Sequence, residues 1–179
     1  GVSFFEEPVP PENLDSLALV RNANIKTELA TGERLYFRWG YKELLQRRLV
    51  DVIQPDICHV GGISELKKIA AMAEVYYVGV QPHNPYGPIN TMAAIQVDVG
   101  MQNFMIQEGG NKPWFDLVVK GDFPRQTDGY YDVPMGPGIG INMDEDVLAA
   151  NPPIESHPPE GYIIASRELW GSNQQTFWG

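Results

Sequence analysis

Residues 50–83 read VDVIQPDICHVGGISELKKIAAMAEVYYVGVQPH. The stretch begins and ends with a short, almost entirely apolar run, at 50–54 and at 78–81. Between these runs, the glycine pair at 61–62 predicts a tight turn into a helix over 63–76, where apolar residues recur at helical spacing. Two apolar strands joined by a helix are typical of a β/α unit, whose parallel strands are covered on both faces.

Ionisable residues close the apolar runs of this chain at nearly constant spacing. Asp56 closes the run at 50–54, and His83 closes the run at 78–81. Three further runs close in the same way, which gives the series Glu6, Glu33, Asp56, His83 and Glu108 with gaps of 27, 23, 27 and 25 residues. A strand, a helix and two loops take up about that length, so the series predicts consecutive β/α units. In a (β/α) barrel the carboxyl ends of the strands converge on one mouth, where active sites lie.

The predicted fold class is α/β, with parallel strands and outer helices as in part of a TIM-like barrel. Residues 1–110 hold five such units, the last with a strand at 104–107, whereas a complete barrel needs about 250 residues. We therefore expect the C-terminal part of a longer enzyme. Residues 111–179 are rich in Gly and Pro and predict a return segment and tail that pack on the barrel or on a second domain.

The composition argues against several function classes. A formal net charge of −10 disfavours binding to nucleic acid or to an anionic membrane surface. No apolar run approaches the roughly 20 residues that span a bilayer, and no signal peptide is visible. Cys58 is the single cysteine, so an intrachain disulfide cannot form, and we expect a cytoplasmic protein.

Glu6 and Glu33 are candidate metal ligands. Two carboxylates on neighbouring strand ends repel each other unless a cation lies between them. Oxygen ligands alone favour a hard divalent ion, with Mg²⁺ ahead of Mn²⁺ or Ca²⁺. The alternative is that Glu6 and Glu7 are solvated loop acids and that Glu33 forms an ion pair with Arg34 or Arg38.

Asp56, His83 and Glu108 are candidate catalytic residues. A carboxylate against one ring nitrogen of His83 would fix its tautomer and raise its basicity, which leaves the other nitrogen as a general base. Glu108 would hydrogen-bond to charge that develops on a substrate. The alternatives are that His83 braces a proline-rich turn and that Glu108 is a surface acid. For the other two histidines, His59 and His157, we predict structural roles.

The local sequences around the five residues resemble those of the enolase superfamily. They are Phe5-Glu6-Glu7-Pro8, Gly32-Glu33-Arg34-Leu35-Tyr36, Gln54-Pro55-Asp56 followed by Gly61-Gly62, Pro82-His83-Asn84 and Ile106-Gln107-Glu108. Within the superfamily the chain is similar to the mandelate racemase/muconate lactonizing enzyme group, and there to acid-sugar dehydratases such as the galactonate dehydratases. The resemblance implies the C-terminal portion, about strands four to eight, of a (β/α)7β barrel.

The resemblance also implies roles for the site residues. Glu6 and Glu33 would be two of three Mg²⁺ ligands. Asp56 and His83 would be the catalytic dyad, and Glu108 would steady the enolic intermediate. The third ligand, a second acid/base residue and a capping domain that selects the substrate would lie upstream of the first residue of this chain.

The implied activity is that of a lyase. The enzyme would abstract the proton α to the carboxylate of an aldonate or aldarate and eliminate the β-hydroxyl, giving a 2-keto-3-deoxy sugar acid. The resemblance further leads us to expect a homo-oligomer. The alternatives are a racemase or epimerase of the same superfamily, which would return the proton from the opposite face, and an inactive barrel fragment that lacks the N-terminal half.

Overall fold

The computed structural model describes residues 1–110, 112–121 and 123–152. By contacts the chain divides into two compact units, Gly1–Met143 and Asp144–Gly179, which we treat separately. The predicted end of the barrel part, residue 110, lies inside the first unit. The prediction that the barrel part ends at this residue is not tested by the division into units. His157 and the rest of residues 153–179 lie outside the described residues. None of the described helices is long and apolar enough to cross a bilayer.

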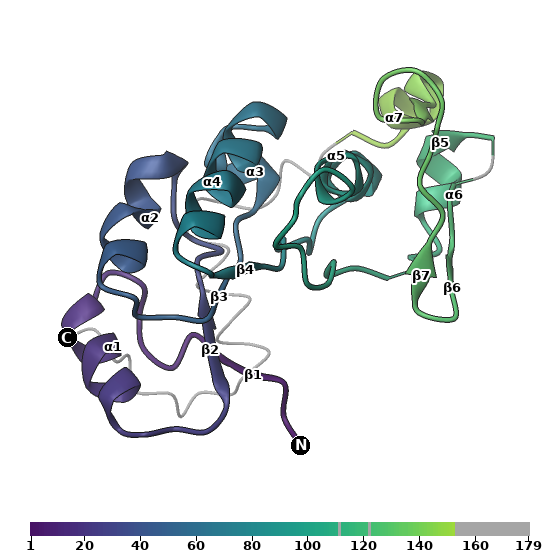
Figure 1. The fold of residues 1–179 in the computed structure, drawn as a ribbon. Coiled ribbons are helices and arrows are strands. Elements are labelled where there is room, and N and C mark those ends of the chain that lie inside the picture. Colours follow the sequence, from purple (N-terminus) through teal and green to yellow (C-terminus); the bar gives the residue numbers. More distant parts are fainter. Residues whose placement is uncertain (111, 122, 153–179) are drawn as a thin grey trace, which may run out of the picture. The chain divides into compact units, whose positions relative to one another are not determined.

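A four-stranded parallel sheet organises the first unit (Figure 1). The strands follow one another in space as they do in sequence, so each new strand is added beside the previous one. Their register is continuous; Glu6, for example, lies opposite Ala30. The strands are β1 (Phe4–Glu6), β2 (Glu28–Thr31), β3 (Val52–Ile53) and β4 (Gly79–Val80). The predicted α/β class with parallel strands is confirmed.

Helices connect the strands and pack on the sheet through their apolar residues (Figure 1). Helix α1 begins where the Asn13 side chain accepts a hydrogen bond from the Ser16 N–H, and α5 begins with Pro88, which has no N–H to satisfy. The core between the helices and the sheet includes the fully buried side chains of Leu29, Leu44 and Ile69. The connecting helices are α1 (Leu14–Asn22), α2 (Phe37–Gln46), α3 (Ile57–Val60), α4 (Ile63–Val75) and α5 (Pro88–Asp98).

The glycine pair at 61–62 makes the predicted turn, between α3 and α4. Gly61 and Gly62 have φ of +106° and +87°, a backbone region that L side chains rarely adopt. A Cβ on Gly61 would also lie 2.9 Å from Phe37 Cε1. The sequence did not predict α3 itself, a single turn that begins when the Asp56 side chain accepts a hydrogen bond from the Cys58 N–H.

The predicted fifth strand at 104–107 is wrong as a continuous strand. One isolated parallel bridge joins Phe104 to Val80, with hydrogen bonds from the Val80 N–H to Asn103 O and from the Met105 N–H to Val80 O. Within the described residues this single bridge is the backbone pairing of the segment with β4.

The described residues after 112 contribute to a second small core, which they share with α5. Phe115, Val119 and Phe123 are buried together with Met92 and Ile95 of α5. This part contains α6 (Phe115–Val118), an antiparallel pair of β5 (Val119–Lys120) with β8 (Asn142–Met143), and a hairpin of β6 (Gln126–Thr127) with β7 (Tyr130–Tyr131). In the second unit, α7 (Glu145–Ala150) begins at Asp144, whose carboxylate accepts a hydrogen bond from the Val147 N–H.

Candidate active site

The series of ionisable residues lies at the carboxyl ends of the parallel strands. Glu6 is the last residue of β1, and Glu33 lies two residues after β2 ends. Asp56 and His83 each lie three residues after their strands end, and the two are joined by a parallel bridge. Glu108 follows the segment that pairs with β4 through Phe104. Because neighbouring parallel strands end at the same edge of a sheet, all of these residues share one rim.

His83 is the centre of the site. Its Nδ1 lies 2.7 Å from Asp56 Oδ2, and its Nε2 lies 3.2 Å from Glu33 Oε2 and 4.0 Å from Glu108 Oε2. The Asp56 side chain is fully buried. Since Asp56 accepts from Nδ1–H, the other ring nitrogen faces the carboxylates of Glu33 and Glu108. The structure therefore brings together four of the five predicted residues by direct contact.

The surroundings of His83 favour its protonated form. Burial lowers the pKa of the imidazole, but the hydrogen bond to Asp56 and the negative charges of Glu33 and Glu108 outweigh burial, so the pKa is raised. Asp56 is held in place by two further donors, the Cys58 N–H at 2.7 Å and Asn90 Nδ2 at 3.3 Å. The buried Asp56 thus stabilises the protonated form of His83.

Glu33 lies among other carboxylates. Burial is the main cause that raises the pKa of Glu33, and the charges of Glu7 and Glu6 raise it further, against the opposing effects of His83 and Arg34. Glu6 Oε2 accepts a hydrogen bond from Gln54 Nε2 at 2.8 Å. Such crowding of like charge is relieved by a bound cation.

The alternative partners of Glu33 are engaged elsewhere. Arg34 forms an ion pair with Glu7, and Arg38 forms one with Glu65. Glu33 makes its polar side-chain contact with His83 instead. The ion pairs proposed as the alternative to a metal site are therefore not what the fold forms.

The donor set suits a hard divalent cation in part. Glu6 and Glu33 offer carboxylate oxygens, the ligand type that Mg²⁺ prefers. Within the described ranges, no group of three or more Asp, Glu, His or Cys side chains is arranged to hold a metal ion. Glu6 and Glu33 therefore offer two carboxylate ligands, which by themselves do not make a complete metal site.

Glu108 is held by the loop that carries His83. Its Oε2 accepts a hydrogen bond from the Asn84 N–H at 2.8 Å, and Asn84 Nδ2 donates to the Glu108 backbone carbonyl at 3.0 Å. Asn84 is itself fixed by Thr91 of α5, at 2.9 Å. The carboxylate is thereby oriented toward the same space as His83 Nε2.

A row of aromatic rings beside the site was missed by the sequence analysis. His59 Nδ1 lies 2.8 Å from the Glu33 carbonyl oxygen, and His59 Nε2 lies 2.9 Å from the Tyr86 hydroxyl. The His59 ring is 5.8 Å from the rings of both Tyr36 and Tyr86. His59 therefore braces the backbone of Glu33. A signal existed, because Tyr36, His59 and Tyr86 each follow a site residue by three positions.

The fold and the rim place this chain among known proteins. A sequence model of the enolase C-terminal domain-like family matches residues 1–147. The chain belongs to this family. This enolase C-terminal domain-like chain is 37% identical over 170 residues to a D-xylonate dehydratase of Haloferax volcanii, an alignment that covers 93% of the chain and 39% of the relative. It is 40% identical over 153 residues to a D-galactonate dehydratase of Ralstonia pickettii, covering 81% and 40%.

Solved structures agree with the sequence relatives. A putative mandelate racemase/muconate lactonizing enzyme from Burkholderia SAR-1 superposes with a TM-score of 0.82 at 37% identity, covering 87% of this chain and 39% of that one. A putative dehydratase from Mesorhizobium loti gives a TM-score of 0.76 at 33% identity, covering 83% and 40%. The enolase C-terminal domain-like chain thus spans about two fifths of the proteins that it matches. The predicted resemblance to this superfamily is confirmed.

Proposed function

We propose that this chain carries the proton-abstracting side of a Mg²⁺-dependent acid-sugar dehydratase. The observation that carries the proposal is the 2.7 Å hydrogen bond between His83 Nδ1 and the fully buried Asp56, which leaves Nε2 facing Glu33 and Glu108. Relatives named D-xylonate dehydratase and D-galactonate dehydratase support the reaction class and an aldonate or aldarate substrate. A cytoplasmic location and a homo-oligomer stay predictions.

The first chemical step is removal of the proton α to the substrate carboxylate. His83 takes this proton at Nε2, and the imidazolium that forms is stabilised by the buried charge of Asp56 through the Nδ1–H bond. Glu108, whose Oε2 lies 4.0 Å from His83 Nε2, is placed to steady the enolate oxygen that gains negative charge. The electron pair of the broken C–H bond is then held in the enolate.

The second step is loss of the β-hydroxyl. The electron pair of the enolate forms the carbon–carbon double bond while the C–O bond breaks, and a proton from the His83 imidazolium leaves with the hydroxyl as water. The resulting enol takes up a proton at C3 and releases the proton of its C2 hydroxyl, so it becomes the 2-keto-3-deoxy acid with no net change in protons. His83 returns to its neutral form, so the cycle balances in protons.

Glu6 and Glu33 would hold the Mg²⁺ ion together with ligands outside the described residues. When bound, the ion would polarise the substrate carboxylate and acidify the α-proton. Gln54 would orient Glu6 through its 2.8 Å hydrogen bond, and His59 would fix the backbone of Glu33.

Mass spectrometry in D₂O tests this function. The protein with Mg²⁺ is incubated with a panel of aldonic and aldaric acids, and His83→Asn is the matched control because it keeps a polar side chain but no base. Loss of one water from at least one acid, absent in His83→Asn, is expected. Deuterium exchange without loss of water would favour the racemase or epimerase, and no change with any acid would contradict catalysis by this chain.

A further inference from the structure

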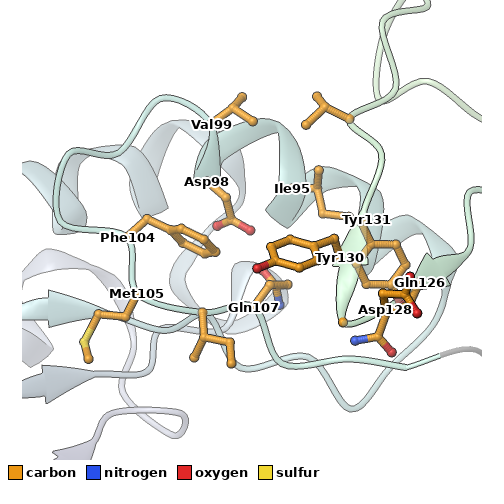
Figure 2. A pocket seen from close by; sticks show the side chains of 13 residues that line it. Ile95, Asp98, Val99, Phe104, Met105, Gln107, Gln126, Asp128, Tyr130 and Tyr131 are labelled. Carbon is orange, nitrogen blue, oxygen red and sulfur yellow. The ribbon is translucent and has the colours of Figure 1, made fainter.

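A cavity of about 510 Å³ lies between the end of α5, residues 104–107 and the β6–β7 hairpin, and it takes no part in the mechanism above. Figure 2 shows the Asp98 side chain pointing from α5 into the space between Phe104 and Tyr130. The polar lining groups are acids, amides and the hydroxyls of two tyrosines, so both donors and acceptors are present. A mixed lining of this kind selects no one class of ligand. A more specific arrangement lies beside the candidate metal ligands.

An ion pair joins the two residues that directly follow these ligands. Glu7 directly follows Glu6. Arg34 directly follows Glu33, and its Nη2 donates a hydrogen bond to Glu7 Oε2. The other carboxylate oxygen, Glu7 Oε1, accepts a hydrogen bond from Thr31 Oγ1 at 3.2 Å. Both oxygens of Glu7 are therefore engaged, one by the last residue of β2 and one by the turn that follows β2.

The backbone at Glu7 has a conformation that needs support. Its φ is +39°, in the left-handed region that residues other than glycine rarely adopt. The Glu7 N–H nevertheless continues the pairing of β1 with β2, since it donates to the Ala30 carbonyl at 2.9 Å. A residue in such a conformation persists only where its surroundings hold it in place. The Glu7 side chain is only 15% exposed, and the contacts of its carboxylate hold it there.

Glu33 and Arg34 are the two central residues of a tight turn. The Leu35 N–H donates to the Gly32 carbonyl at 3.1 Å, which closes the turn around them. Arg34 bonds to Glu7, whereas Glu33 lies at the rim. Because Glu33 and Arg34 share a peptide bond inside this closed turn, the contact that holds Arg34 also limits where Glu33 can lie.

We propose that Glu7 and Arg34 are positioning residues that fix the separation of the two candidate Mg²⁺ ligands. This role rests on the function proposed above, in which Glu6 and Glu33 hold the ion. Mg²⁺ demands nearly ideal octahedral geometry with ligands at about 2.0–2.1 Å, whereas Ca²⁺ accepts more ligands in a flexible arrangement. A pair that fixes the ligand separation therefore favours Mg²⁺ over Ca²⁺.

The sign of one substitution separates positioning from simple charge. The positive charge of Arg34 repels a bound cation, so its removal by charge alone would tighten Mg²⁺ binding. A positioning role predicts the opposite result, weaker Mg²⁺ binding. A partly exposed ion pair contributes little to the free energy of unfolding, so general loss of structure is not expected. Arg34→Gln is therefore the decisive variant.

Calorimetric titration of the 179-residue chain with Mg²⁺ and, separately, with Ca²⁺ tests the proposal. Arg38→Gln is the matched control, because Arg38 forms the same kind of ion pair with Glu65. The arginine and glutamate side chains are 53% and 15% exposed in the Glu7 pair and 44% and 12% exposed in the Glu65 pair. Arg34→Lys tests rescue, because one guanidinium nitrogen makes the contact and an ammonium group can replace it.

Arg34→Gln is expected to weaken Mg²⁺ binding by about tenfold and Ca²⁺ binding by less than about threefold. Arg34→Lys and Arg38→Gln should bind both ions as the parent chain does. Because Glu7 and Arg34 act as a pair, Glu7→Gln combined with Arg34→Gln should bind Mg²⁺ no more weakly than Glu7→Gln alone.

Several outcomes would overturn the proposal. They are unchanged or tighter Mg²⁺ binding by Arg34→Gln, equal losses for Mg²⁺ and Ca²⁺, an equal loss in Arg38→Gln, no rescue by Arg34→Lys, and additive losses in the double variant.

Glu6→Gln separates a failure of this proposal from a failure of the proposed function. Weak Mg²⁺ binding by Glu6→Gln with unchanged binding by Arg34→Gln would keep Glu6 as a ligand and remove only the positioning role. No Mg²⁺ binding by the parent chain, or equal binding by the parent chain and Glu6→Gln, would overturn both the ligand assignment and the positioning role.

Discussion

At the scale of single residues, Asp56 and Asp98 carry the same carboxyl group but differ in their hydrogen-bond partners. Both carboxylates are buried. Asp56 accepts hydrogen bonds from His83 and the Cys58 N–H, whereas Asp98 has no partner among the described residues. A buried carboxylate is stable as an anion only where donors replace water. Asp56 is therefore suited to stabilise a cationic histidine, whereas burial raises the pKa of Asp98 to about 8 and favours its neutral form.

Asp56→Asn should lower the pKa of His83. Burial already acts in that direction, and the substitution removes the hydrogen bond to a charged acceptor and one of the negative charges that raise the pKa. NMR titration of the His83 ring protons measures the change, with Asp132→Asn, an exposed acid, as the control. An unchanged His83 pKa in Asp56→Asn would contradict the charge-stabilised pair.

Asp98→Asn should change how the stability of the chain depends on pH. The pKa of Asp98 is raised by burial to about 8 in the folded state, against about 3.9 unfolded. The charged or titratable groups that face it across the cavity are Asp128, Tyr130 and Tyr131, none of them basic. Between about pH 4 and 8 only the folded state keeps the proton, so the free energy of unfolding falls as pH rises, by at most about 1.4 kcal/mol per unit.

Urea unfolding at several pH values between 5 and 8 measures this slope. Asp98→Asn should flatten it and leave the variant more stable than the parent at pH 8 (roughly the folded-state pKa). Asp128→Asn, which removes an exposed acid at the same cavity, should keep the slope. A parent chain whose stability does not fall over this range would show that Asp98 has already found a partner.

At the scale of elements, each β/α unit delivers its functional residue through the loop that follows the strand. The β3 unit is the clearest case, because Asp56 both caps α3 and bonds to His83. One carboxylate oxygen fixes the local turn, and the other serves the site. The Asp56 side chain therefore both fixes the turn that begins α3 and holds the ring of His83.

Gly61→Ala should destabilise the chain by about 1–3 kcal/mol, because a Cβ is disfavoured at φ +106° and would meet Phe37 at 2.9 Å. Denaturant unfolding measures the loss. Gly100→Ala is the matched control, since its Cβ would meet only the Val97 carbonyl, at an ordinary 3.5 Å. Equal stability of the two variants would mean that the turn between α3 and α4 does not need glycine.

At the scale of the whole molecule, the candidate metal site exists only once the sheet has formed. Glu6 and Glu33 belong to different strands, and the pairing of β1 with β2 brings their carboxylates close enough to raise the pKa of Glu33. The aromatic row of Tyr36, His59 and Tyr86 likewise joins residues that follow three different strands. Both features depend on the parallel arrangement of the strands, because successive parallel strands end at the same edge of the sheet.

Glu6→Gln and Glu33→Gln should each weaken Mg²⁺ binding by about tenfold or more, because each removes a charged oxygen while keeping the side-chain shape. Calorimetric titration with Mg²⁺ measures the loss. Glu74→Gln, an exposed acid on α4, makes the same change in net charge and should have little effect. Equal losses in all three variants would assign the effect to net charge and remove both glutamates as ligands.

Several features of this protein follow from its sequence alone. Apolar runs that close on Glu6, Glu33, Asp56, His83 and Glu108 predicted the parallel α/β class and the rim, because strand length and crossover length are local properties. The turn at 61–62 was equally readable, since left-handed backbone favours glycine. The roles of the five residues stay predictions, for which the geometry supplies support.

Tertiary structure decided the rest. It replaced the predicted strand at 104–107 by a single bridge, because a ladder depends on how a neighbouring strand lies beside the segment, which no local pattern supplies. It placed His59, for which a structural role was predicted, against the backbone carbonyl of Glu33, and it buried Asp98 of α5 without a hydrogen-bond partner among the described residues. The burial of a side chain and its hydrogen-bond partners depend on which segments, distant in the sequence, come into contact. Only the folded chain contains that information.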